Sequence, residues 1–256
     1  MLLRGVFDVA KKMKSAEDFM HHLYIHMNDV EHFVVYSGLT LKQFMSSIEP
    51  LKNVLLLKHT YEDGSFNMHT QFDYVSSEEI PNFRKKEMDS ATDLCWVDFN
   101  SEKNVDLLTP FEQAELLYFR HRREPLGSPL YTKLQNRYSY FSSNLDKMTK
   151  IYFRFMADSE LLVANFFNRM IKEKEGTGSF WRRKVKGDVL TIDPSILRAF
   201  RSYAKEGALL SLYKMDKNAQ YGIEIRALAE YDFPDEVWDN LDEILTVSFD
   251  ELIQIS

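Results

Sequence analysis

Apolar residues recur along the chain in short runs with two different periods. Every second residue from Ile151 to Phe155 is a large apolar one, which is the pattern of a half-buried strand. Over residues 158–174 the spacing is instead helical, with an apolar stripe formed by Val163, Phe166, Phe167, Met170 and Ile171. The chain therefore mixes strands with helices.

The two-residue period predicts strands that follow one another in pairs. We expect strands over residues 32–36, 53–60, 66–75, 94–99, 137–142, 149–155, 209–215 and 221–228. Asp63-Gly64 favours a hairpin turn between the second and third of these, because glycine tolerates a positive φ. Two further hairpins are expected, one joining 137–142 to 149–155 and one joining 209–215 to 221–228. Residues 247–255 are predicted to be a strand or a last helical turn.

Helices are predicted where capping residues precede an apolar stripe. The clearest start is Thr109-Pro110-Phe111-Glu112, where Thr109 caps, Pro110 fits the first position and Glu112 completes a capping box. Ser15-Ala16-Glu17-Asp18 resembles a second box and predicts a helix over about 15–28. Other helices are expected over 40–48, from Asp193 to Gly207 and over 234–244, with a loop or frayed helix over 76–90.

Hairpins interspersed with helices, rather than a strict alternation of strand and helix, predict an α+β fold with mainly antiparallel pairing. The segment Glu124-Pro125-Leu126-Gly127-Ser128-Pro129 ends the preceding helix and marks a boundary. We expect an acidic half, 1–126, packed closely against a basic-then-acidic half, 127–256, or one continuous domain.

Composition narrows the class of protein. The chain has 256 residues, of which 45% are hydrophobic and 28% charged, so it has enough apolar residues for a core and is not a disordered chain. The one cysteine, Cys95, excludes an internal disulfide scaffold and is expected to be a buried, unreactive thiol. No run approaches the roughly 18 apolar residues of a membrane span, and the first residues do not resemble a secretory signal. We therefore expect a soluble, cytoplasmic protein.

Charge is distributed in blocks along the chain. Residues 120–206 carry 18 basic and 9 acidic residues, whereas 227–256 carry nine acidic residues and no Lys or Arg. Residues 1–119 are also acidic, and the whole chain has a net charge of −7. The basic middle could bind a polyanion, pair with an acidic protein partner, or be neutralised by the acidic C-terminal region of the same chain.

Asp18, His22 and His26 repeat every four residues. On a helix they would share one face, where two imidazoles and a carboxylate could chelate a divalent metal ion. The alternative is a solvated or interface face, on which histidine pairs are common. No cofactor other than this divalent metal is indicated.

Two basic segments are candidate contacts for an anion or a partner. The first comprises Arg120, Arg122 and Arg123 at the end of a helix, where cations also favour the helix dipole. The second combines an aromatic residue with cations in Trp181, Arg182, Arg183 and Lys184, a composition suited to bases and phosphates, lipid head groups or an acidic protein groove. A solvated loop with Trp181 in the core is the alternative for the second segment.

No nucleotide-binding glycine loop and no nucleophile elbow is present, and no pair of acids is placed for acid–base catalysis, so whether the protein is an enzyme stays open. Our leading hypothesis is a non-enzymatic interaction or regulatory protein that binds a protein partner through its segregated charges. The alternatives are a nucleic-acid-binding protein that uses the basic, aromatic middle and a metal-dependent enzyme with the Asp/His/His site.

Overall fold

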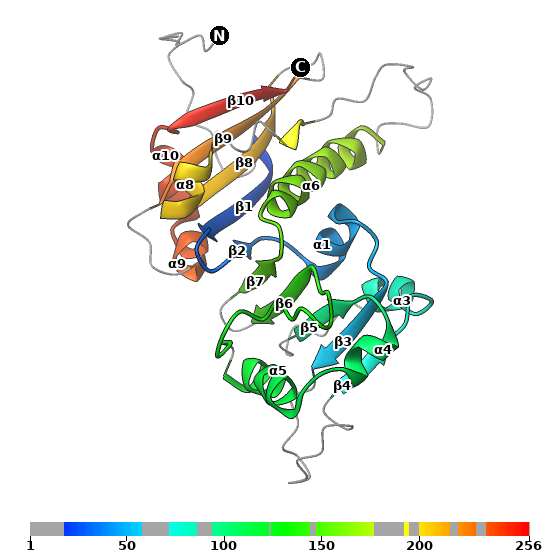
Figure 1. Cartoon of the computed structure of the whole chain (residues 1–256). Helices are drawn as coiled ribbons and strands as arrows, with labels where there is room; N and C mark the ends of the chain where they lie inside the picture. The colour runs from blue at the N-terminus through cyan, green and yellow to red at the C-terminus, as the bar shows by residue number, and fades with distance from the viewer. Residues whose placement is uncertain are drawn as a thin grey trace.

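The computed structural model describes residues 18–57, 72–85, 94–122, 124–143, 147–176, 192–194, 200–215, 220–228 and 234–255. These residues form one ten-stranded sheet with helices on its two faces (Figure 1). None of the helices in these ranges is long and apolar enough to cross a membrane.

The strands of the sheet are β1 (Phe19–Asn28), β2 (Phe33–Ser37), β3 (Asn53–Leu57), β4 (Phe72–Val75), β5 (Leu94–Phe99), β6 (Tyr138–Ser143), β7 (Met148–Phe153), β8 (Ala208–Lys214), β9 (Tyr221–Ala227) and β10 (Glu251–Ile255). Their order is β10-β9-β8-β1-β2-β7-β6-β5-β3-β4, and every neighbouring pair is antiparallel. The expected α+β fold with antiparallel pairing is therefore confirmed. Because β1 and β2 lie between β8 and β7, strands from both sides of residue 126 meet in one sheet, and the division at 126 stays a prediction.

The helices in the described ranges are α1 (Leu41–Ser47), α3 (Ile80–Lys85), α4 (Glu102–Asp106), α5 (Pro110–Arg122), α6 (Ala157–Gly176), α8 (Arg201–Glu206), α9 (Pro234–Asp239) and α10 (Leu241–Thr246). One face of the sheet carries α1, α6 and α8. The other face carries α5 over one part and α9 with α10 over another. Figure 1 shows this separation, with α9 and α10 beside β1 and β8 and with α5 beside the lower strands.

The first face holds a continuous apolar core that runs across the whole sheet. Alternate residues of each strand point into it, among them Tyr36 of β2 and Trp96 of β5. The rings of Trp96 and Tyr140 are stacked, with centroids 4.9 Å apart, because the two residues are cross-strand partners. Burial of one such large side chain contributes on the order of 2 kcal/mol. This core therefore supplies much of the stability of the described fold.

The second face holds two smaller clusters with a gap between them. Under α5, Phe119 packs with Cys95 and Phe141, and under α9 and α10, Tyr24 packs with Val237. The strands between the clusters are less covered, and they carry His26, Val35 and Lys150 on this face. As expected, Cys95 is buried, and burial raises the pKa of its thiol.

The helix predicted over residues 15–28 is wrong, because Phe19–Asn28 form strand β1. The apolar positions Phe19, Leu23 and Met27 are four residues apart, and a spacing of four fits one face of a strand as well as one face of a helix. Pairing with β2 on one side and β8 on the other selects the strand. The alternation of Leu23, Ile25 and Met27, which all face the main core, was the local sign of it.

Other local expectations are confirmed or refined. The hairpins β6–β7 and β8–β9 form as predicted, and β3 pairs antiparallel with β4, although the Asp63-Gly64 turn lies outside the described residues. Thr109 and Glu112 form the expected capping box of α5. The single helix expected over 234–244 is instead two short helices that meet at Asn240, and residues 251–255 form β10.

Asp98, near the end of β5, is a buried carboxylate that supports the start of β6. One of its oxygens, Oδ1, accepts hydrogen bonds from the backbone N–H groups of Arg137 (2.9 Å) and Tyr138 (2.6 Å). Burial raises the pKa of Asp98 to about 6, and these N–H donors offset only part of that rise. Because the pKa is higher in the folded than in the unfolded protein, the stability from this group is present below about pH 4 and is lost as the pH rises through 6.

We predict that Asp98→Asn becomes more stable relative to the unsubstituted protein as the pH rises. The amide oxygen of Asn can accept the same two N–H bonds without a charge to desolvate. A pKa shift of two units corresponds to about 3 kcal/mol, so the difference in unfolding free energy should change by about that amount between pH 4 and pH 7. Urea denaturation of both proteins at the two pH values measures it, and a pH-independent difference would contradict the assignment.

Candidate functional site

A cleft of about 500 Å³ opens where β1 begins and β2 ends. Its walls come from four elements, namely β1, the end of β2, the turn before β7, and α9. The lining residues are Phe19, Met20, His21, His22, Ser37, Gly38, Lys147 and Trp238. A cleft of this size that combines aromatic walls with a few polar groups is a common form of binding site.

Two adjacent histidines of β1 point to opposite faces of the sheet, as successive residues of a strand do. His21 packs edge-on against Phe166 of α6, with ring centroids 5.0 Å apart. His22 lies on the opposite face, where its Nδ1 is 2.9 Å from the hydroxyl of Ser211 in β8. Both residues line the cleft, so its floor connects the two faces of the sheet.

Gly38 allows the cleft walls to approach each other closely. Its φ is +87°, and a Cβ at this position would lie only 2.6 Å from the carbonyl oxygen of His22 and 3.3 Å from the ring of Trp238. Only glycine fits such a conformation and such an approach. Nε2 of His21 donates to the carbonyl oxygen of Gly38 at 2.8 Å, which holds this backbone in place.

A hydrogen-bonded chain fixes the position of Trp238. Its indole N–H donates to the hydroxyl of Ser37 at 2.6 Å, and that hydroxyl donates to the carbonyl oxygen of Lys147. The chain therefore ties α9 to β2 and to the turn between β6 and β7. Because Ser37 is buried, the aromatic wall is held by groups that bulk water does not reach.

A row of buried polar side chains lies behind His22. Ser211 is its hydrogen-bond partner, and Glu224 stands opposite Ser211 on the neighbouring strand β9. Glu224 and Arg226 form an ion pair at 2.8 Å, in which the side chains are only 2% and 6% exposed. Nε of Arg226 also donates to the carbonyl oxygen of Val247 at 3.4 Å. Desolvation makes such a buried pair expensive, so its presence is weak evidence for stability.

The residues that line the cleft include three nitrogen bases and no carboxylate. The bases are His21, His22 and Lys147. Burial lowers the pKa of His21, and the hydrogen bond with Gly38 offsets part of that effect. Burial therefore favours the neutral imidazole of His21, and Lys147 brings a basic side chain to the lining.

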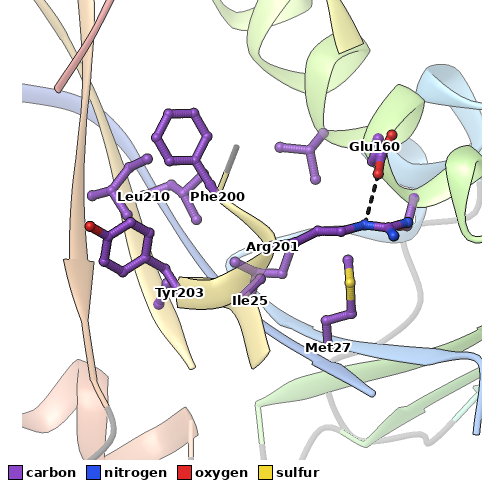
Figure 2. Close-up of a pocket in the computed structure, with 12 residues that line it drawn as sticks. Ile25, Met27, Glu160, Phe200, Arg201, Tyr203 and Leu210 are labelled. Atoms are coloured by element: carbon purple, nitrogen blue, oxygen red, sulfur yellow. Dashed lines mark ion pairs between the residues drawn. The ribbon is translucent and has the colours of Figure 1, made fainter. Parts of the chain in front are cut away.

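A second pocket lies between α6, α8 and the first face of the sheet (Figure 2). Figure 2 shows Arg201 extending above Met27 toward Glu160, and its Nε is 2.9 Å from Oε1 of Glu160. The remaining lining is mostly apolar, and the cavity volume is only about 30 Å³. That volume holds a water molecule or two but no organic ligand, so this pocket is a feature of packing.

The helical geometry on which the metal site depended is wrong. Asp18 precedes β1, and His22 and His26 are four residues apart on that strand, which separates them by about 13 Å along the backbone. One metal ion cannot bridge that distance. Within the described ranges no group of three or more His, Cys, Asp or Glu residues could hold a metal ion.

Arg120 is a structural residue rather than an exposed anion contact. Its side chain is 7% exposed, and its Nε donates to the carbonyl oxygen of Leu57 in β3 at 3.2 Å. It lies four residues after the buried Leu116, so the two side chains share one face of α5. Arg122 ends α5, but its side chain lies outside the described residues, as do Arg123, Trp181, Arg182, Arg183 and Lys184.

Sequence reasoning missed most of the cleft. His22 was singled out, but for a metal site, while Ser37, Gly38, Lys147, Ser211 and Trp238 carried no motif. They come from distant parts of the chain, and only the pairing of β1 with β2 and β8 brings them together. The one available local signal was a glycine directly after a predicted strand.

No protein-family model, no curated protein and no solved structure matches this chain.

We predict that Arg120→Met destabilises the protein, because the substitution removes the donor to Leu57 from a buried site. Loss of a buried hydrogen bond costs about 2 kcal/mol of unfolding free energy. The matched control is Lys103→Met, the same kind of substitution at an exposed position of α4, for which we expect a change below about 0.5 kcal/mol. Chemical denaturation followed by circular dichroism measures both. Equal stability of the two variants would show that Arg120 has no structural role.

Proposed function

We propose that the protein is a non-enzymatic, cytoplasmic interaction protein that binds an acidic segment of a protein partner in the cleft around Gly38. The observation that carries the proposal is the lining of that cleft, which has three nitrogen bases and no carboxylate although the chain as a whole has a net charge of −7. Such a local departure from the overall charge favours a ligand that brings negative charge.

The aromatic lining supports a partner that also contributes an apolar side chain. Trp238 and Phe19 offer ring surfaces, and tryptophan is among the residues that most often dominate binding energy at interfaces. The hydrogen bond from Trp238 to Ser37 orders the indole before binding. A prearranged wall reduces the entropy that association costs.

The two serines near the cleft, Ser37 and Ser211, are placed in a way that supports binding rather than catalysis. Ser211, beside His22, is fully buried and so is not accessible to a substrate. The hydroxyl of Ser37 accepts from Trp238 and donates to Lys147. Neither serine is therefore arranged as an exposed nucleophile next to a histidine base.

The charge blocks also support a partner. In the ranges that the structure describes, no ion pair joins an acid of residues 227–256 to a base of residues 120–206. The acidic helices α9 and α10 instead pack through apolar residues. Other bases of the block are paired with acids elsewhere in the chain, as Arg137 is with Asp158 and Lys205 with Asp29, so the charge proposed to meet the partner is that of Lys147 in the cleft.

We predict that a fluorescein-labelled peptide with several glutamates around one tyrosine binds more tightly than the same peptide with glutamines. Lys147→Glu and Trp238→Phe should each weaken binding of the acidic peptide roughly tenfold, since each removes a contact worth about 1.4 kcal/mol. Lys103→Glu, the same charge change at an exposed position on α4, should leave the affinity unchanged. Fluorescence anisotropy at low salt measures all four proteins.

Two outcomes would contradict the proposal. One is equal affinity for the acidic and the glutamine peptides. The other is salt-sensitive binding of single-stranded RNA or DNA that Lys147→Glu does not change, which would favour the alternative of a nucleic-acid-binding protein.

A further inference from the structure

The two adjacent histidines of the cleft are the only lining residues whose charge changes near neutral pH. We infer that the cleft is an oxyanion site and that the histidine pair His21–His22 takes up a proton when the site is filled. This inference rests on the proposed function, because it assigns the chemistry of the group that enters the same cleft.

The geometry leaves the imidazole of His21 able to gain a proton without losing its existing contact. Nε2 of His21 donates to the carbonyl oxygen of Gly38, so protonation adds a second N–H at Nδ1 and keeps this bond. Nδ1 of His22 faces the hydroxyl of Ser211, and Nε2 of His22 is buried. His21 can therefore become a cation while the cleft keeps its shape.

The empty cleft opposes that protonation. His21 is held between Phe166 and the backbone of Gly38, and its burial disfavours the imidazolium form. Lys147, on the turn before β7, adds a like charge to the lining. An oxyanion bound among these groups reverses the balance, because an opposite charge within a few ångströms raises a histidine pKa by about 1–3 units.

Several carboxylates lie around the histidines but outside the lining of the cleft. Behind His22, Glu224 of β9 is already paired with Arg226. On α9, Asp235, Glu236 and Asp239 flank Trp238 in the sequence, but none of them lines the cleft. Asp18 precedes β1 and is exposed. A variant that removes both imidazoles therefore separates their contribution to the pH dependence of binding from that of these acids.

The ligand class follows from the lining. An oxyanion such as a carboxylate or a sulfonate suits Lys147 and the histidines, and an attached ring or aliphatic group suits Trp238 and Phe19. The hydroxyl of Ser37 already accepts a hydrogen bond from Trp238 and donates one to Lys147. The charged residues therefore determine which ligands bind. A neutral ring compound lacks the group that these cations recognise.

Benzenesulfonate is the probe that tests this inference, because it stays ionised throughout the range and cannot itself take up a proton. We expect it to bind the full chain roughly tenfold more tightly at pH 6 than at pH 8. Isothermal titration calorimetry at pH 6.5, in two buffers of different ionisation enthalpy, should show uptake of roughly half a proton per ligand. Benzyl alcohol, with the same ring and no charge, should bind far more weakly.

Two conservative variants locate the proton. His21→Gln keeps an amide nitrogen where Nε2 donates to Gly38, and His22→Asn keeps one where Nδ1 faces Ser211. We expect the double variant to bind benzenesulfonate with the same affinity at pH 6 and at pH 8, so that the gain in affinity at pH 6 is lost. If the double variant does not fold, the calorimetric comparison of two buffers on the unsubstituted chain still measures whether binding takes up a proton.

The results separate this inference from the proposed function. Binding of benzenesulfonate without proton uptake, or with a pH dependence that persists in the double variant, would overturn the proton coupling while the acidic peptide still binds. Failure of benzenesulfonate to bind at either pH would overturn the oxyanion site. Proton-coupled binding of benzenesulfonate, with no binding of the acidic peptide, would support the oxyanion site and reject the protein partner.

Discussion

The position of β1 in the middle of the sheet is the constraint on which the rest of the structure depends. This strand pairs with β2 on one edge and with β8 on the other, so it joins the strands that lead to β10 with those that lead to β4. Its two faces contribute to two apolar clusters, with Leu23 in one and Tyr24 in the other. A shift of one residue in its register would exchange these faces, so both cores hold the register in place.

The cleft is a consequence of that placement. The pairing of β1 with β2 places His21 and His22 beside the end of β2, where Gly38 lets Trp238 approach. The polar groups behind them cost free energy to bury, and the apolar cores on both faces offset that cost. The same pairing thus supplies the stability of the fold and the polar floor of its candidate site.

Much of the fold was predictable from local patterns, whereas the site was not. The capping box at Thr109 and the alternation of the β6–β7 and β8–β9 hairpins act within a few residues, so they appear in the sequence. The error at β1 arose because a spacing of four residues fits both periods, and only tertiary pairing decides between them. The contact of Trp238 with Ser37 spans 201 positions, and no local pattern encodes such a meeting.

The proposed partner places an acidic group in the cleft beside Trp238, and this contact can be observed directly. The indole N–H signals of the three tryptophans, Trp96, Trp181 and Trp238, test it most directly in a two-dimensional NMR titration with the acidic peptide. The account predicts that the signal of Trp238 shifts progressively, while that of Trp96, buried in the main core, stays in place. A titration that shifts Trp181 and leaves Trp238 unchanged would contradict it.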